Sequence, residues 1–315
     1  MLVKNERNSD IEKLISRSYR LFETGNFLEA QGVLNEAYTL DFENEEIKSA
    51  LRACGFWQQR VLSLESLAGD GPRGDYLRRQ WNHYVSRYKT GFNHPLDEGS
   101  ARLKRWVHEK ALEHYRRQSA MSTDSEALLQ AGRCLKALGR YEESISTFEE
   151  ALRSAGKEDA RILADLADTY AIIGESKAAK VLMREALFLG ASKIDLKEIA
   201  SPLFRRLIDR LSEIRDVNGA DFIEWLPVYG AVWSVFDVKR ELTAVEYGKL
   251  KQTIYALKSE IADGDRNGCL TPRLINLFIR LIDHYQSSGV DRSVIEEALI
   301  NIKLLSPSVY REYFE

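Results

Sequence analysis

Apolar residues recur every three or four positions over most of this chain, which is the spacing of one face of an α-helix. Between residues 125 and 154 the pattern forms two runs, which Gly139 separates. A glycine at such a place can take the left-handed conformation that ends a helix. The pattern therefore predicts two short antiparallel helices, with their apolar positions at Leu128, Ala131, Gly132 and Leu135, then Tyr141, Ser144, Ile145, Phe148, Ala151 and Leu152.

The same pattern occurs three times. The segment ARILADLADTYAIIGESKAAKVLMREALFLGA aligns without a gap, 35 residues later, with SEALLQAGRCLKALGRYEESISTFEEALRSAG, so that Gly174 takes the place of Gly139. A more divergent copy near the N-terminus, IEKLISRSYRLFETGNFLEAQGVLNEAYTL, places Gly25 in the same slot. One helix pair cannot bury its apolar stripes alone, so repeated pairs predict a stacked solenoid.

The remaining segments are also predicted to be helical. The chain has 315 residues with only 19 Gly and 6 Pro, and 44% of it is apolar, which favours a helical protein with a sizeable core. Further helices are expected at 45–67, 75–90, 100–118, 202–214, 243–261 and 271–287, followed by a repeat-like final pair. The expected parts are an N-terminal helix pair (1–44), an irregular basic and aromatic segment (45–124), two repeats (125–192) and a C-terminal helical region with a degenerate repeat-like cap (193–315).

These residues resemble the tetratricopeptide repeat family, whose 34-residue pattern alternates large and small residues around a turn glycine. The matching slots read Leu128, Gly132, Leu135, Gly139, Ser144, Phe148 and Ala151; Leu163, Ala167, Tyr170, Gly174, Ala179, Met183 and Ala186; and Leu14, Ser18, Leu21, Gly25, Ala30, Leu34 and Ala37. The resemblance covers roughly a third of the chain. It implies an all-α, right-handed superhelical solenoid of antiparallel helix pairs, with an atypical C-terminal helical region.

The resemblance also implies a partner-binding groove, lined by the first helix of each pair, for a peptide or an amphipathic helix. The groove positions carried onto this chain are Glu126, Leu129, Arg133, Lys136, Arg161, Ala164, Asp168 and Ala171. Some members hold a C-terminal carboxylate through Lys and Asn in the groove. The matching slots here hold Ile15, Tyr19, Leu129, Arg133 and Ala164, so that carboxylate clamp is missing.

Charge adds a second candidate surface. The chain has a net charge of −3, yet residues 73–118 carry eleven Lys and Arg against five Asp and Glu, interleaved with aromatic residues. The basic patch consists of Arg78, Arg79, Arg87, Lys89, Arg102, Lys104 and Arg105. Basic side chains beside Trp and Tyr can bind nucleic acid, and a basic patch can equally attract an acidic protein. The plain alternative is a helix pair with its aromatic residues inside and its arginines outside.

The sequence motifs that could indicate a cofactor, metal or catalytic site are weak. The string GDGPRG (69–74) lacks the preceding strand of a dinucleotide-binding loop, and DGDRNGCL (263–270) lacks the glutamate that completes a calcium loop. Four histidines, at positions 83, 94, 108 and 114, lack the spacing of a metal pair on a helix, and the three cysteines are scattered. We therefore expect no enzyme activity, no cofactor and no metal.

An apolar stretch at 222–236 is too short to span a bilayer and predicts a buried helix, with a ligand cavity near Trp225 and Trp233 as an alternative. The N-terminus lacks the apolar core of a signal peptide, so a cytoplasmic location is expected. The sequence thus predicts a non-enzymatic adaptor that binds a segment of another protein, possessing no membrane span. The alternative is a nucleic-acid-associated regulator that acts through residues 73–118.

Overall fold

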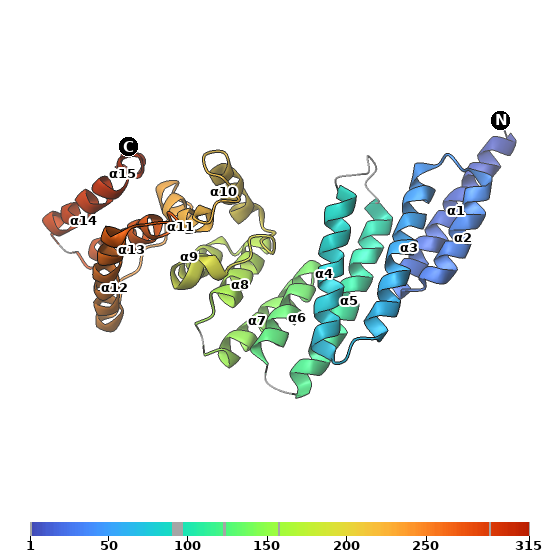
Figure 1. The fold of residues 1–315 in the computed structure, drawn as a ribbon, viewed down its shortest axis with the longest axis horizontal. Helices are drawn as coiled ribbons and strands as arrows, with labels where there is room; N and C mark the ends of the chain where they lie inside the picture. The colour runs from blue at the N-terminus through green and yellow to red at the C-terminus, as the bar shows by residue number, and fades with distance from the viewer. Residues whose placement is uncertain (1, 90–96, 122–123, 157, 290, 315) are drawn as a thin grey trace. The chain divides into compact units, whose positions relative to one another are not determined.

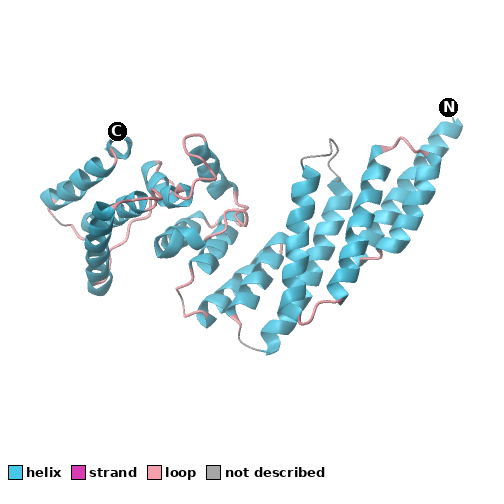
Figure 2. Ribbon diagram, viewed as in Figure 1, coloured by secondary structure: helices cyan, strands magenta, loops and turns pink. Residues whose placement is uncertain are grey.

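The computed structural model describes residues 2–89, 97–121, 124–156, 158–289 and 291–314. Within these ranges every regular element is a helix, as Figure 2 shows: fifteen α-helices and one short 3-10 helix. The predicted all-α fold class is confirmed. The chain forms two compact units, unit 1 (Met1–Ser154) and unit 2 (Ala155–Glu315), so the boundary falls between the two repeats at 125–192.

Unit 1 contains seven α-helices in its described residues. Each of α1, α4 and α6 packs against the helix that follows it, and α5 also contacts α1 and α6 (Figure 1). The bounds are α1 Leu2–Thr24, α2 Phe27–Leu40, α3 Glu45–Glu65, α4 Asp70–Lys89, α5 Asp97–Met121, α6 Ser125–Ala137 and α7 Tyr141–Ser154. The core includes a cluster of aromatic residues: Trp57 is fully buried, and its ring meets that of Trp106 edge-on at 5.6 Å.

Unit 2 contains eight α-helices in its described part. Helices α8 and α9 pack against each other extensively, and α13 packs against α11, α12 and α14. The bounds are α8 Ala160–Ile172, α9 Ser176–Gly190, the 3-10 helix Ala191–Lys193, α10 Pro202–Ser212, α11 Phe222–Val232, α12 Ala244–Asp263, α13 Leu270–Ser287, α14 Arg292–Leu305 and α15 Pro307–Phe314.

The three aligned glycines close the same turn. Gly25, Gly139 and Gly174 all have positive φ angles, of 77°, 77° and 90°. In each copy the backbone N–H after the glycine donates to a carbonyl five residues earlier, which satisfies a carbonyl at the helix end. These bonds are Asn26 N to Leu21 O at 3.0 Å, Arg140 N to Leu135 O at 3.0 Å and Glu175 N to Tyr170 O at 2.9 Å. The shared turn supports the alignment of the three helix pairs.

The helices of the pair α6 and α7 approach closely because Gly132 has no side chain. A Cβ atom at Gly132 would overlap the ring of Phe148, which is fully buried. The hydroxyl of Ser144 donates to the carbonyl oxygen of Gly132 at 2.9 Å, across the same contact. Small residues at these slots therefore set the distance between the two helices.

The aromatic segment of unit 2 is part of the core. Phe222, Trp225 and Tyr229 of α11 are buried, and Pro227 lies inside this helix. The indole N–H of Trp225 donates to Asp221 at 2.8 Å, and the guanidinium of Arg215 lies 3.8 Å from the centre of its ring. In the described residues no helix is long and apolar enough to cross a membrane.

Candidate functional site

The first helix of the best-matched repeat, α6, has two faces. Leu128, Ala131 and Leu135 are buried together with most of the helix. The positions left exposed or half-buried along its length include Glu126, Gln130, Arg133 and Ala137, with spacings of four, three and four that define one stripe. We call these four residues the α6 face. The side-chain amide of Gln130 donates to Glu126 at 2.7 Å, so the face has at least one internal contact.

Burial divides the eight residues that the sequence placed in a groove. Glu126 is exposed, while Arg133, Arg161 and Ala171 are half-buried. The other four are buried inside the fold: Leu129, Lys136, Ala164 and Asp168. Arg161 forms an ion pair with Asp159, the N-cap of α8, at 2.7 Å.

Asp168 has a role within unit 2. Its two carboxylate oxygens accept the backbone N–H groups of Ala200 and Ser201, each at 2.9 Å, and the side chain is fully buried. These bonds fix the chain just before α10, which begins at Pro202. The carboxylate of Asp168 is therefore occupied inside the fold and does not face solvent, contrary to its expected place in the groove.

Several aromatic residues in the described part of the basic segment are buried. Tyr84, Trp106 and Tyr115 are at most 6% exposed, and Trp81 is half-buried against Tyr84, with ring centres 5.8 Å apart. Nucleic acid binding by stacking needs open aromatic faces. These buried rings instead belong to the core of unit 1. This is the alternative in which the aromatic residues lie inside the helix pair and the arginines lie outside.

The basic patch is partly neutralised. Arg102 and Arg105 both form ion pairs with Glu23 of α1, the second at 3.0 Å, and these contacts lower the pKa of Glu23. Partial desolvation lowers the pKa of Lys104, although this residue is exposed. Arg79 is exposed. The patch also includes Arg78 (half-buried), Arg87 (exposed) and Lys89, whose side chain lies outside the described residues.

His108 is a buried imidazole at the edge of this patch. It is 5% exposed, and its Nδ1 atom has no hydrogen-bond partner among the described residues. Burial, together with the positive charges of Arg78 and Lys104, lowers the pKa of His108 to about 3. The ring is therefore neutral at pH 7 and fills space beside Trp81, with ring centres 6.0 Å apart.

We expect His108 to make the protein less stable in acid. Its pKa is about 3 in the folded chain and about 6.5 when exposed, so only the unfolded chain takes up the proton between these values. The free energy of unfolding should fall by up to about 1.4 kcal/mol per pH unit from pH 6.5 downward on this account. Urea unfolding at pH 7, 6, 5 and 4 checks this. His108→Gln should show a shallower decline, and parallel curves for the two proteins would contradict it.

The two strings that resemble ligand-binding loops, at 263–270 and 69–74, form turns and helix ends in the structure. Asp265, from the calcium-like string, accepts the backbone N–H groups of Leu270 and Thr271 at 3.2 and 2.9 Å, and so it caps the start of α13. The glycine-rich string 69–74 enters the first turn of α4 with helices on both sides. Across the described residues, no group of three His, Cys, Asp or Glu side chains could hold a metal ion. His94 lies outside the described residues.

Sequence reasoning missed a wide cavity near the C-terminus. A space of about 790 Å³ lies among α13, α14 and α15, with Leu299 and Tyr313 among its lining residues. Ile300 and Leu304, one turn apart on α14, are 57% and 79% exposed. In the sequence, the available signal was this pair of apolar residues four positions apart, and it is weak because single apolar residues are common on protein surfaces.

Comparison with known proteins agrees with the geometry of α6 and α7. A family model described as tetratricopeptide repeat matches residues 125–158, which begin at the start of α6 and include α7. No match was found among the curated proteins. Repeats of this family suggest a protein–protein interaction scaffold, and proteins with them are generally non-enzymatic. Residues 125–158 of this chain therefore match the tetratricopeptide repeat.

Proposed function

We propose that this chain is a cytoplasmic, non-enzymatic scaffold that binds a peptide or helical segment of a partner protein on the α6 face. The observation that carries the proposal is the division of α6 into a buried face and an accessible stripe. Gly132 and its neighbours fix α6 against α7, so the stripe is held on a rigid element. A rigid face limits the ordering cost of binding, which favours recognition of a flexible partner segment.

The chemistry of the α6 face favours an amphipathic partner. Glu126 and Arg133 supply opposite charges about two helical turns apart, and Ala137 supplies a small apolar surface. Arg161 and Ala171 of α8 are half-buried, and they are proposed to contact the partner protein on unit 2 itself. The exposed cations of the basic patch, such as Arg79, would attract an acidic partner and orient it by long-range electrostatics.

Affinity capture with matched charge reversals tests this proposal. Arg133→Glu on α6 should reduce recovery of the partner about tenfold or more, because charge complementarity at the interface is inverted. Arg153→Glu is the control, since Arg153 is an exposed arginine on α7, the second helix of the same repeat. It should leave recovery unchanged. Glu126→Arg provides a second variant on the face, at an exposed position.

The capture should be run from lysate at low and moderate salt, with and without nuclease, and read by mass spectrometry and nucleic-acid staining. Circular dichroism establishes that each variant is folded. A protein that survives nuclease and is lost in both α6 variants supports the scaffold. Equal recovery with Arg133→Glu and Arg153→Glu contradicts the α6 face. Recovery of nucleic acid alone, lost as salt rises, would favour the basic segment instead.

A further inference from the structure

Helix α14 has one accessible face. Ala298, Leu299 and Ile302 on its other side are buried in unit 2. The accessible face carries Ile300 and Leu304, the apolar pair beside the wide cavity, and their side chains are 57% and 79% exposed. Side chains four residues apart lie one above the other on a helix, so the two form a continuous apolar strip. A strip of this kind is what one helix presents to another in a helix–helix contact.

Two exposed charges flank the apolar strip. Glu296 lies four residues before Ile300, and Lys303 lies three residues after it. Seven residues make about two turns of a helix, so both charges lie on the same side of the strip. We call Glu296, Ile300, Lys303 and Leu304 the α14 face. The order along the helix is therefore a negative charge, an apolar centre and a positive charge.

Neither charge is strongly bound within the chain. Glu296 pairs with Arg292 at 3.3 Å, but the two side chains are 60% and 87% exposed, and exposed pairs contribute little to stability. The ammonium group of Lys303 lies 5.3 Å from the ring centre of Tyr310, and within the described residues Lys303 forms no ion pair. Both charges can therefore pair with groups of another molecule at little cost.

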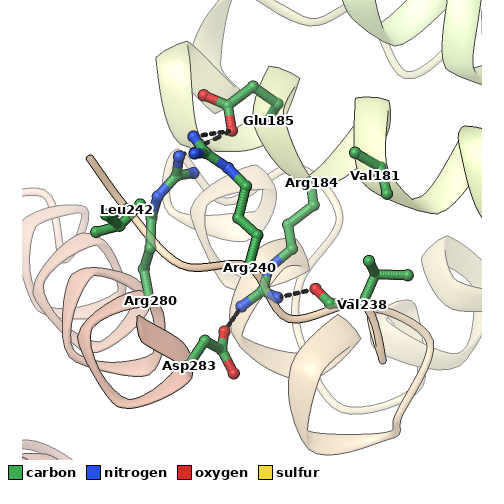
Figure 3. A pocket seen from close by; sticks show the side chains of 8 residues that line it. All are labelled: Val181, Arg184, Glu185, Val238, Arg240, Leu242, Arg280 and Asp283. Atoms are coloured by element: carbon green, nitrogen blue, oxygen red, sulfur yellow. Dashed lines mark hydrogen bonds and ion pairs between the residues drawn. The ribbon is translucent and has the colours of Figure 1, made fainter. Parts of the chain in front are cut away.

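The α14 face stands on a fixed support. Helix α14 packs on α13, and Figure 3 shows how α13 is tied to α9 by two ion pairs. Arg184 of α9 pairs with Asp283 of α13, and Arg280 of α13 pairs with Glu185 of α9 at 2.8 Å. Because this support is already ordered, association through the α14 face would cost little further ordering.

The charges of the α14 face are complementary to the same face in reverse. In an antiparallel pair of identical helices with a two-fold axis at Ile300, residues at similar distances on either side of the axis lie opposite each other. Glu296 of each copy then faces Lys303 of the other, and the two Ile300 side chains meet at the axis. A parallel pair would instead place like charges together, which is unfavourable.

We propose that the α14 face binds a second copy of this chain, through an antiparallel two-fold pair of α14 helices. Glu296 and Ile300 also line the wide cavity, so the contact can extend from α14 toward α15. A stable interface buries about 800 Å² on each partner, and two exposed apolar side chains supply only part of that area. We therefore expect a reversible dimer with a dissociation constant in the micromolar range.

Sedimentation of the whole chain at rising concentration, at constant low salt, tests the dimer. The parent should move from the mass of one chain toward that of two. Glu296→Lys and Lys303→Glu should each weaken the dimer about tenfold or more, because each places like charges opposite each other twice. An equal mixture of the two variants should dimerise again, since every facing pair then has opposite charges. Rescue by mixing cannot come from a local defect, which both variants would retain.

Lys249→Glu is the matched control, because Lys249 is an exposed lysine on α12, outside the α14 face. It should change the dissociation constant less than about twofold. Ile300→Asp should abolish the dimer and still fold, since this side chain is 57% exposed. A parent that keeps the mass of one chain at every concentration would overturn the proposal. So would single reversals without effect, or a mixture that fails to dimerise. The α6 face takes no part in these measurements, so the scaffold proposal stands or falls separately.

Discussion

Asp283→Ala is expected to lower the free energy of unfolding by about 3–5 kcal/mol, because it leaves the guanidinium of Arg184 buried without its carboxylate. Arg184 is 15% exposed and stays charged at neutral pH, where its pKa of about 10 lies well above the ambient pH. Removal of one member of a buried pair costs far more than the pair itself contributes. Urea unfolding followed by circular dichroism measures the change.

Asp237→Ala is the control for this prediction. Asp237 lies in the segment that connects α11 to α12 and pairs with Lys180 of α9 at 3.0 Å, but its side chain is 56% exposed. An exposed pair contributes about 0–1 kcal/mol, so this variant should unfold nearly as the parent does. Similar losses in the two variants would show that the Arg184–Asp283 contact does not carry the stability of this region.

Phe148→Ala is expected to destabilise unit 1 by about 3–5 kcal/mol, because it removes a fully buried ring and leaves a cavity against Gly132. Phe148 fills the space that the missing side chain of Gly132 provides, so the two positions act as a pair. Thermal or urea unfolding of the whole chain measures the loss. The exposed neighbour Glu150→Ala should stay within about 0.5 kcal/mol of the parent.

A complementary variant separates packing from simple loss of apolar surface. Gly132→Leu should also destabilise, by about 1–3 kcal/mol, because its side chain overlaps the Phe148 ring. Combined with Phe148→Ala it should recover part of the loss, since the new side chain occupies the vacated space. Additive losses in the double variant would mean that these residues are not packed as the repeat requires.

The repeats could be predicted because their signals are local. Gly25, Gly139 and Gly174 each follow a helix-period stripe, and a glycine at a helix end is recognisable from a few residues of sequence. Helix ends were less well determined. The start of α4 is Asp70 and not residue 75, because Pro72 is compatible with a first turn and Asp70 is held by His114 of α5 at 2.6 Å.

The candidate sites could not be derived to the same extent, because they depend on contacts between distant residues. Arg184 and Asp283 are 99 positions apart, and no local pattern pairs them. Asp168 is a polar residue at an expected groove position of α8. Its carboxylate nevertheless accepts hydrogen bonds from the backbone N–H groups of Ala200 and Ser201. The family pattern indicates which helix lines a groove, but it does not indicate which of its side chains the rest of the chain buries.

Equilibrium titration of the captured partner, purified, against the whole chain tests the scaffold account most directly. The account predicts that Arg133→Glu raises the dissociation constant about tenfold or more, while Arg153→Glu changes it less than about twofold. Both variants should retain the parent's circular dichroism spectrum. Equal affinities for the parent and Arg133→Glu, or equal weakening by the two reversals, would contradict the claim that the α6 face binds the partner.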